Sequence, residues 1–578
     1  MFLHRTRRPA GPPRRPRSRH GRALAVATAA VASAALLAAC GGPSGGTGAT
    51  TGGDASSITV FNGSTGTITE NFNPLSTTAL QPTLGVIFQP LYWYNLASDA
   101  EPTPLLATAH EWNEDGTQLT ITTRDGVSWS DGEPFSAADV AFTFNLVKDT
   151  PALNTSGLAA TAEATDDTTV VLTFPETSFM QEPAVLGNQA IVPEHVWKDV
   201  ADPVTEINSD PVGTGPYTVK SFSAQSYVLE KNPEYWEEGL PKVDEVRYIA
   251  LDTADAASAA LTAGDVDWMS SFLPGLDDLI ATNPDLSYVN TPALTASVFT
   301  CSNADLGCEG PQTDKAVRQA LYLAIDRTQL NNLAGGGFAE TASPTLLLPE
   351  RDERWITDAS LLTAPETADV AAANEILDAA GWEPGDDGVR VKDGERLSMT
   401  IQTVTGWSDF ISLNDAMKQQ AAEAGIELVP SQVAWNEWNQ AQTTGTFQLS
   451  LDSIGLGASS NPYFTYFGKY DSANTVKVGE TASAGNYARF SNPDVDAALA
   501  VARATDDEAV QTAEYAKVQA IIADELPYIP IYVNSMLTEF NTSRATGWPT
   551  DDDKYAMPAS WKAWDNGIVL KSITPVEN

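Results

Sequence analysis

Patterns typical of strands and of helices alternate along almost the whole of this 578-residue chain, and that alternation limits the folds open to it. Strand patterns, marked by period-two alternation or β-branched runs, occur at 57–66, 168–174 and 397–404. Helical patterns lie between them, and the one at 136–149 begins with Ser136 and Asp139 at the spacing of a capping pair. Helices that alternate with strands predict a mixed α/β protein.

Further local signals refine this pattern. The stretch 118–132 predicts two strands joined by an Asp-Gly turn, and 313–326 predicts an amphipathic helix with Thr313 as its cap. Arg327 is expected to close that helix, where a cation is favoured. Gly381 is expected to end another helix, and a strand is predicted directly after Pro527.

The body of the chain carries no linker after residue 57. The remaining length of some 520 residues is enough for two or more lobes. Two lobes built from interleaved segments fit an unbroken α/β pattern better than domains joined in series.

The first 39 residues resemble an export signal. Residues 1–22 hold eight arginines and no acid, and 23–39 is apolar and rich in alanine. The ending Leu37-Ala38-Ala39-Cys40 resembles the bacterial lipobox, which implies cleavage before Cys40 and a lipid on its sulfur. A permanent transmembrane anchor is the alternative. The arginine pairs leave both the general and the twin-arginine export routes open.

Residues 40–57 are predicted to be the lipidated cysteine and a flexible tether. The stretch 41–57 contains seven glycines and almost no apolar side chain, so it cannot bury enough surface to offset its ordering entropy. Such a tether places the protein on the outer face of a cell membrane, at the cell surface or in a periplasm.

The charge of the exported part excludes one class of partner. Residues 1–22 contain eight of the 33 basic residues and none of the 75 acidic ones, which leaves the rest at about −50. A surface this acidic repels phosphates, so nucleic-acid binding is not expected. This negative charge does not identify a ligand, and its expected effect is to keep the protein soluble.

Cys301 and Cys308 are the only cysteines after Cys40. Outside the cytoplasm they can form a disulfide, while a metal site is the rival interpretation. The exported part has only His110 and His195, so neither a zinc site nor any other metal centre or cofactor is predicted.

Several stretches, in order, resemble the extracytoplasmic solute-binding proteins of ABC importers, family 5, the peptide/nickel type. They are "LTITTRDGVSWSDGEPFSAADVAFTF", "IVPEHVW", "PVGTGPYTV", "LEKNPEYW", "ALTAGDVDW", "TDKAVRQALYLAIDRTQL", "AANEILDAAGW" and "FSNPDVDAAL". Most of these residues are interpreted as structural, and Gly213, Gly215 and Pro216 as a tight turn. The resemblance covers residues 58 to about 540.

The resemblance implies a periplasmic-binding-protein-like clamp of type II, cluster C, with an extra subdomain in lobe I. We expect lobe I at 58–95, 205–297 and 535–578, its subdomain at 96–204 and lobe II at 298–534. The lobes close on a ligand without chemistry, and the closed form is presented to an ABC permease with its ATPase subunits. A monomer is expected.

The ligand class is less plain. Peptide-binding members place an aspartate against the peptide's amino terminus, in a pattern like D-x-x-D-P. Here Asn461-Pro462 stands at that place, the expected acid is missing, and Asp452 lies earlier, within a strand. An amine buried without a counter-charge is costly, which weakens the peptide hypothesis.

Oligosaccharide-binding members of the same family stack sugar rings on aromatic side chains. The chain has 14 tryptophans, all in the exported part. The candidate ligand contacts are Trp407, Trp435, Trp438, Asn461, Tyr463 and Trp548, with Asn62, Glu70 and Asn71 as second candidates on the loop 62–75. For each tryptophan the alternative is packing. An oligosaccharide is therefore preferred, ahead of an oligopeptide and of a metal chelate.

Two other classes stay as remote alternatives. A secreted glycoside hydrolase needs two opposed carboxylates, and 75 acids allow many imagined pairs. A passive surface adhesin needs no particular motif. The family resemblance argues against both, so no enzyme activity is predicted.

Overall fold

The computed structural model describes residues 56–273, 275–482 and 485–576. The predicted signal peptide, Cys40 and nearly all of the tether lie outside these residues. Among the helices described, none is both long enough and apolar enough to cross a bilayer.

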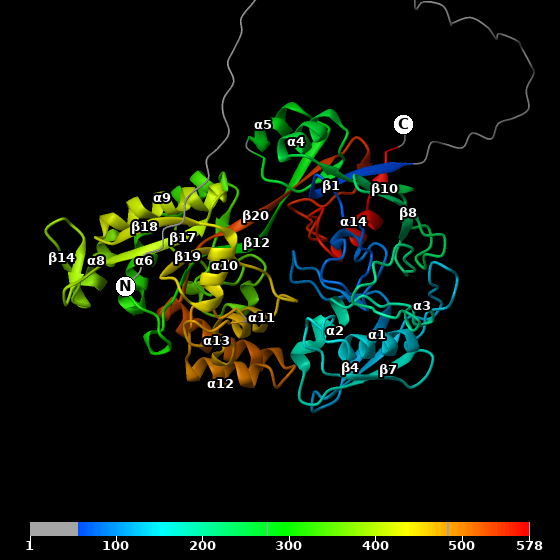
Figure 1. The fold of residues 1–578 in the computed structure, drawn as a ribbon, viewed down its shortest axis with the longest axis horizontal. Coiled ribbons are helices and arrows are strands. Elements are labelled where there is room, and N and C mark those ends of the chain that lie inside the picture. The colour runs from blue at the N-terminus through cyan, green and yellow to red at the C-terminus, as the bar shows by residue number, and fades with distance from the viewer. Residues whose placement is uncertain (1–55, 274, 483–484, 577–578) are drawn as a thin grey trace, which may run out of the picture. The chain divides into compact units, whose positions relative to one another are not determined.

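One large mixed sheet runs through the described chain (Figure 1). Its order is β18-β17-β19-β12-β20-β11-β1-β10-β9-β8, and β13 also pairs with β20. The strands are β18 (Glu427–Val433), β17 (Ser398–Val404), β19 (Leu449–Ile454), β12 (Leu286–Thr300), β20 (Tyr528–Asn541), β11 (Trp268–Met269), β1 (Ser57–Thr65), β10 (Glu245–Leu251), β9 (Ser226–Lys231), β8 (Tyr217–Ser223) and β13 (Glu340–Thr341).

The long antiparallel strands β12 and β20 join the two halves of this sheet. The N-terminal end of β12 and the C-terminal end of β20 lie in lobe I. The C-terminal end of β12 and the N-terminal end of β20 lie in lobe II. The pairing register shifts between Pro292 and Leu294 and again between Ala296 and Ser297. Such bulges bend a strand locally, and they lie close to the predicted boundary of the lobes at residues 297 and 298.

Smaller sheets flank the large one. A four-stranded sheet has the order β4-β5-β7-β6, and it is formed by β4 (Ala107–Trp112), β5 (Gln118–Thr123), β7 (Thr169–Thr173) and β6 (Thr161–Ala164). The remaining strands are β2 (Tyr92–Trp93), β3 (Thr103–Pro104), β14 (Glu383–Pro384), β15 (Arg390–Lys392), β16 (Glu395–Arg396), β21 (Ala545–Thr546) and β22 (Thr574–Pro575).

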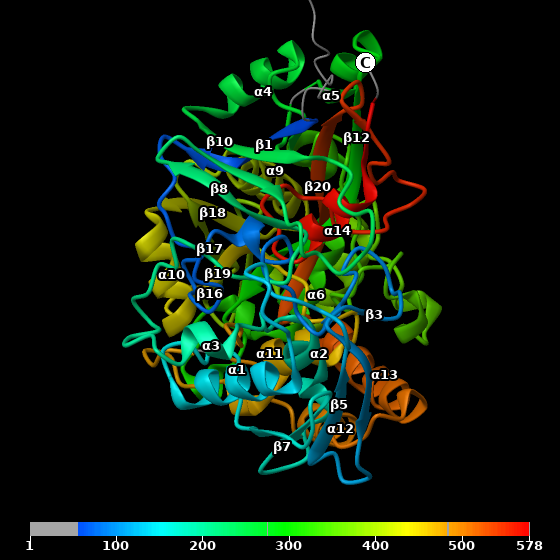
Figure 2. The ribbon, with the colours of Figure 1, turned by 90° about the vertical axis from the view of Figure 1, so that its right-hand side faces the viewer.

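The helices of lobe I and its subdomain are α1 (Ala137–Asp149), α2 (Glu182–Gly187), α3 (Glu194–Trp197), α4 (Ala254–Ala263), α5 (Leu276–Thr282) and α14 (Asp565–Ser572). Those of lobe II are α6 (Lys315–Ala324), α7 (Arg327–Leu330), α8 (Val370–Ala379), α9 (Ser408–Glu423), α10 (Trp435–Thr444), α11 (Tyr463–Tyr470), α12 (Pro493–Ala502) and α13 (Glu508–Glu525). Helix α1 packs against β6 and β7 in the subdomain. Figure 2 shows α1 next to β7.

The described residues form several separate hydrophobic cores. One core draws on residues 75–197, two others draw on residues 296–532, and the core around β1, β10 and α14 belongs to lobe I. The exact domain boundaries stay a prediction.

Most local predictions hold. Ser136 and Asp139 form the capping box of α1, and Gly381 follows α8 with a φ of +84°. The second strand of the predicted 118–132 hairpin is wrong, because residues 124–136 make only an isolated bridge between Ser128 and Pro134.

The signals around α6 need two corrections. Asp314, not Thr313, caps α6, since its carboxylate accepts the backbone N–H of Ala316. Asp326 caps α7, so Arg327 begins a helix and does not close one. Its buried guanidinium instead donates to the carbonyl oxygens of Pro530 and Pro365.

Candidate ligand-binding site

A cavity of about 270 Å³ lies between lobe II and the lobe I side that carries the subdomain. One wall comes from residues 94–96, 99–102, Trp112, 179–180 and 182–183, and the other from 354–355, 459–461, Phe464, Asp506, Glu508 and Gln511. Because both lobes contribute, a molecule in this cavity contacts both at once. The cavity is therefore the candidate binding site.

Aromatic side chains form much of both walls. Trp112 packs against Phe179 with ring centroids 5.4 Å apart, and its indole N–H donates to Glu182 at 2.8 Å. On the other wall, Trp355 is 2% exposed and packs edge-on against Tyr515. The rings are thus fixed by their own packing before any ligand arrives.

Asn461, a predicted contact, lines the cavity and anchors its wall. Its amide nitrogen donates to Gln511 at 2.9 Å. Its amide oxygen accepts from the hydroxyl of Tyr515 at 2.7 Å and from the backbone N–H of Tyr463. Asn461 therefore ties the loop between β19 and α11 to helix α13.

A loop of lobe I, residues 95–103, borders the cavity and is gripped by lobe II. Asp99 accepts hydrogen bonds from Arg354 at 3.0 Å and from the hydroxyl of Ser460. On its other side the loop borders a second cavity of about 640 Å³, whose walls include Glu340, Glu350 and 551–553. The loop thus separates the two cavities.

The three tryptophans predicted in lobe II lie near one another but differ in exposure. Trp407 precedes α9 and meets Trp438 edge to face, with ring centroids 5.0 Å apart. Trp438 is 5% exposed, whereas Trp435 is 53% exposed at the start of α10. Only Trp435 of this group presents most of its ring to the outside, and none of the three lines the cavity.

Tyr463 and Trp548 are buried among other rings. Tyr463 stacks on Phe467 at 5.3 Å, next to the cavity wall. Trp548 stacks on Phe540 at 4.7 Å inside the lobe I core, and its indole N–H donates to the carbonyl of Ala545. These contacts give both residues a packing role, while their ligand role stays a prediction.

The three polar candidates of lobe I lie outside the cavity wall. Asn62 accepts from the backbone N–H and hydroxyl of Ser64. Asn71 is buried and donates to Thr78 at 2.9 Å, so its amide shapes its own loop. Glu70 is partly exposed. Their ligand roles also stay predictions.

Lobe II carries two charged groups that are not paired with each other. Burial raises the pKa of the Asp452 carboxyl, on β19, to about 6. Burial also lowers the pKa of Lys469 on α11, whose ammonium lies 5.6 Å from the ring centroid of Phe299 and 5.2 Å from that of Tyr487. The hydrogen bond to Asp452 found within the described residues comes from Ser453 N–H. The environment therefore penalises both charges.

Cys301 and Cys308 are joined by a disulfide, with their Cα atoms 5.4 Å apart. The bridge ties the end of β12 to the loop that precedes α6. Cys40 lies outside the described residues.

Sequence reasoning missed most of the cavity. Tyr94, Asp99, Arg354, Phe464 and Glu508 line it and belong to none of the recognised stretches. Their positions along the chain are far apart, so no periodicity or spacing connects them. The one local signal available was the charged run ending in a tryptophan at 350–355.

The comparison with protein families decides what kind of protein carries this cavity. The model of the bacterial extracellular solute-binding proteins, family 5, matches residues 101–475. The chain belongs to this family. It is accordingly a solute-binding protein with a two-lobed α/β fold, and it is not an enzyme.

Relatives agree with this assignment. Protein XP55 of Streptomyces lividans is 33% identical over 440 residues, which cover 74% of this chain and 75% of that protein. The oligopeptide-binding protein AppA of Bacillus subtilis is 26% identical, over 72% and 75% of the two chains. The glutathione-binding protein GsiB of Salmonella typhimurium is 25% identical, over 80% and 86%.

Solved structures show the same fold. The periplasmic oligopeptide-binding protein of an oligopeptide ABC transporter from Thermotoga maritima matches with a TM-score of 0.81 at 25% identity. The match covers 90% of this chain and 99% of that one. A second structure of that protein, with mannohexaose bound, matches with a TM-score of 0.73 over 91% and 100% of the two chains.

Proposed function

We propose that this family-5 protein captures an oligosaccharide between its lobes and delivers it to an ABC permease. The observation that carries the proposal is the cavity whose walls, from both lobes, combine aromatic rings with amide, hydroxyl and carboxylate groups. Rings that cover apolar sugar faces and polar groups that bond hydroxyls are what a neutral sugar needs. The mannohexaose bound by the Thermotoga protein supports the same ligand class.

Capture follows from the geometry of the two walls. A ligand that contacts Trp112 on one wall and Phe464 on the other gains both sets of contacts only when the lobes are close together. The ligand therefore shifts the lobe equilibrium by its differential affinity for the closed state. A monomer suffices for this, and the permease with its ATPase subunits would receive the closed form.

An oligopeptide is the second candidate. Asp452 and Lys469, which are not part of the wall of the 270 Å³ cavity, are charged groups in a poorly solvating environment, and the ends of a peptide carry the complementary charges. The relatives AppA and GsiB, which bind an oligopeptide and glutathione, support this candidate.

A ligand screen distinguishes the two classes. We expect manno- and cello-oligosaccharides of about two to six units to raise the melting temperature more than di- to pentapeptides do. A ligand present at about 100 times its Kd adds about 2.7 kcal/mol to the free energy of unfolding, which a thermal scan detects readily. Peptides that raise the melting temperature while sugars leave it unchanged would reject the oligosaccharide proposal.

Two variants sharpen the result. Asp452→Asn removes the carboxylate, so it should weaken peptide binding and leave sugar binding unchanged. Trp435→Ala tests whether this half-exposed ring contacts the sugar, in which case the variant should bind the sugar more weakly. Its matched control is Trp561→Ala, which removes a ring that is 43% exposed in lobe I. Incubation with the same sugars should yield no cleavage product, since a product would indicate a hydrolase.

We also propose that a lipid on Cys40 anchors the protein to the outer face of the membrane, with residues 41–55 as the tether. Ser57, the last residue of the tether expected from the sequence, instead begins β1. Cys40→Ser should release the protein from the membrane fraction into the medium or periplasm, as measured by fractionation and immunoblotting. Continued membrane attachment of this variant would instead indicate that the apolar segment 23–39 is retained as an anchor.

A further inference from the structure

Lobe II holds the 95–103 loop of lobe I through an arginine that bridges carboxylates of both lobes. Arg354 donates to Asp99 of the loop at 3.0 Å and to Glu508 of its own lobe at 3.0 Å. Its guanidinium also stacks over the ring of Trp355, 4.4 Å from the centroid. Glu508 and Trp355 thus orient the arginine within lobe II, and Asp99 is the partner that lobe I supplies.

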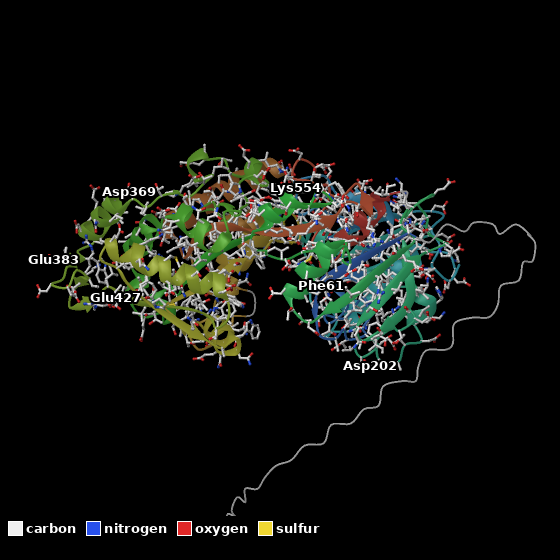
Figure 3. The ribbon with its side chains drawn as sticks, turned by 90° about the horizontal axis from the view of Figure 1, so that it is seen from above. Phe61, Asp202, Asp369, Glu383, Glu427 and Lys554 are labelled. Carbon is white, nitrogen blue, oxygen red and sulfur yellow. A yellow bond between two sulfur atoms is a disulfide. The ribbon has the colours of Figure 1, made fainter. Side chains whose placement is uncertain are left out.

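Two more contacts cross between the lobes from the same short segment of lobe II. Arg351 donates to the carbonyl oxygen of Leu96 at 3.1 Å, and its guanidinium is held by buried Asp352. Glu350 lies 3.6 Å from the ammonium of Lys554, a residue of lobe I that Figure 3 labels. Residues 350–354 therefore contact lobe I at three points.

These contacts differ from the other connections between the lobes. All of their residues lie outside the strands β12 and β20. Exposed ion pairs contribute little singly, and they contribute more when fixed partners orient them in a network. Here the partners within lobe II fix Arg351 and Arg354 in advance.

We propose that Glu350, Arg351 and Arg354 of lobe II, with Leu96, Asp99 and Lys554 of lobe I, form a clasp that favours the ligand-binding arrangement of the lobes. The clasp residues act as positioning residues through the lobe equilibrium. The inference rests on the proposed function, in which a ligand is captured between the lobes. The apparent Kd of any ligand is its intrinsic Kd divided by the fraction of molecules in the competent state.

Two consequences follow. Weakening the clasp should raise the apparent Kd of every ligand by the same factor, whatever the ligand's chemistry. Binding of a neutral sugar, which has no charge to screen, should still become weaker as salt rises, because the clasp itself is screened.

The first experiment needs no ligand. Fluorescent labels are placed on Glu163→Cys in the subdomain and Lys517→Cys on α13, both exposed positions, in a chain whose Cys40 is replaced by serine. Energy transfer between the labels should fall as NaCl rises from about 0.02 M to about 0.5 M, across the range in which screening becomes strong. Asp99→Asn and Lys554→Gln should already show the low value and lose most of the salt response.

The matched control is Arg396→Gln. Arg396 is 42% exposed, as against 45% for Arg354, and it also pairs with two carboxylates, Asp387 and Glu427, but both belong to lobe II. This variant should retain the wild-type salt response. If the clasp variants show the same energy transfer as the wild-type protein at both salt concentrations, the clasp proposal is overturned.

The second experiment measures affinity by calorimetry with mannohexaose and with a pentapeptide. Asp99→Asn and Lys554→Gln should each weaken the binding of whichever probe binds by about twofold to fivefold, the range expected for such ion pairs. Lys554 lines the second, 640 Å³ cavity but not the 270 Å³ cavity, so its effect on a ligand in the proposed site cannot come from direct contact. Unchanged affinity in both variants rejects the clasp. If neither probe binds the wild-type protein, the proposed function fails on its own, and the energy-transfer result still decides the clasp.

Discussion

Replacing Glu539 by glutamine is expected to raise the free energy of unfolding by about 3 kcal/mol at pH 7. Glu539 lies on β20, where it pairs with Tyr288 of β12 and Met269 of β11. It is 0% exposed, and neither carboxyl oxygen has a hydrogen-bond partner within the described residues. Two residues along the strand, on the same face, Leu537 belongs to the apolar core beneath α4 and α5.

Burial raises the pKa of Glu539 to about 8, from an ordinary value of 4.5. Below pH 4.5 the carboxyl is protonated in both the folded and the unfolded protein, so its ionisation costs nothing. As the pH rises toward 8, the unfolded chain loses the proton while the folded protein keeps it, and stability falls. Glutamine mimics the neutral form at every pH and removes this penalty.

Urea unfolding from pH 4 to pH 8.5 measures the effect. The difference between Glu539→Gln and the wild-type protein should be near zero at pH 4 and should grow up to about pH 8. Glu163→Gln, on the exposed side of strand β6, is the control and should show no such pH-dependent gain. A difference that is constant with pH would show that Glu539 does not ionise in the way its burial implies.

The fold could be predicted from the sequence to the extent that its signals are local. The capping box at Ser136 and the glycine after α8 involve residues only a few positions apart, so the pattern contains the whole interaction. The second strand predicted at 118–132 failed because a strand needs a partner, and residues 124–136, between β5 and α1, pair only at one isolated bridge.

The candidate site was predicted only in part, because a residue's type does not determine its exposure. Trp435 and Trp438 are three positions apart on α10, yet one is 53% and the other 5% exposed, since Trp407 from another element covers Trp438. The cavity is built from segments that meet only in the folded chain, and Asp99 with Arg354 is the plainest case.

The surroundings of charged side chains were likewise not predictable from the sequence. The sequence preference for a neutral ligand rested on the missing acid before Asn461. The structure adds that Asp452 lies in a buried environment near Lys469, a feature of three-dimensional surroundings that the sequence pattern does not contain. The melting-temperature screen with sugars and peptides, together with the effect of Asp452→Asn on peptide binding, therefore distinguishes the ligand classes.

Gly213→Ala is expected to lower the free energy of unfolding by about 3 kcal/mol or more, because an added methyl group would collide with backbone atoms. A Cβ at Gly213 would overlap the carbonyl oxygen of Ile87, and one at Gly215 that of Val86. The backbone N–H of Gly215 also donates to the oxygen of Ile87 at 2.8 Å. Neither glycine has a positive φ, so the close approach of two chain segments, and not a left-handed backbone conformation, requires glycine at both positions.

The position of this contact links it to the site. Residues 86–87 precede the subdomain in sequence and Gly213 follows it, so the contact holds the two chain segments that connect the subdomain to lobe I. The control is Gly455→Ala, whose added Cβ would meet only the Leu294 side chain, at 3.6 Å, and whose φ is not positive. That variant should change stability by no more than about 0.5 kcal/mol. Urea unfolding of both variants measures the difference. Equal stabilities would show that the two segments can separate without cost. The cavity wall formed by residues 94–102 would then be less firmly placed than the contact implies.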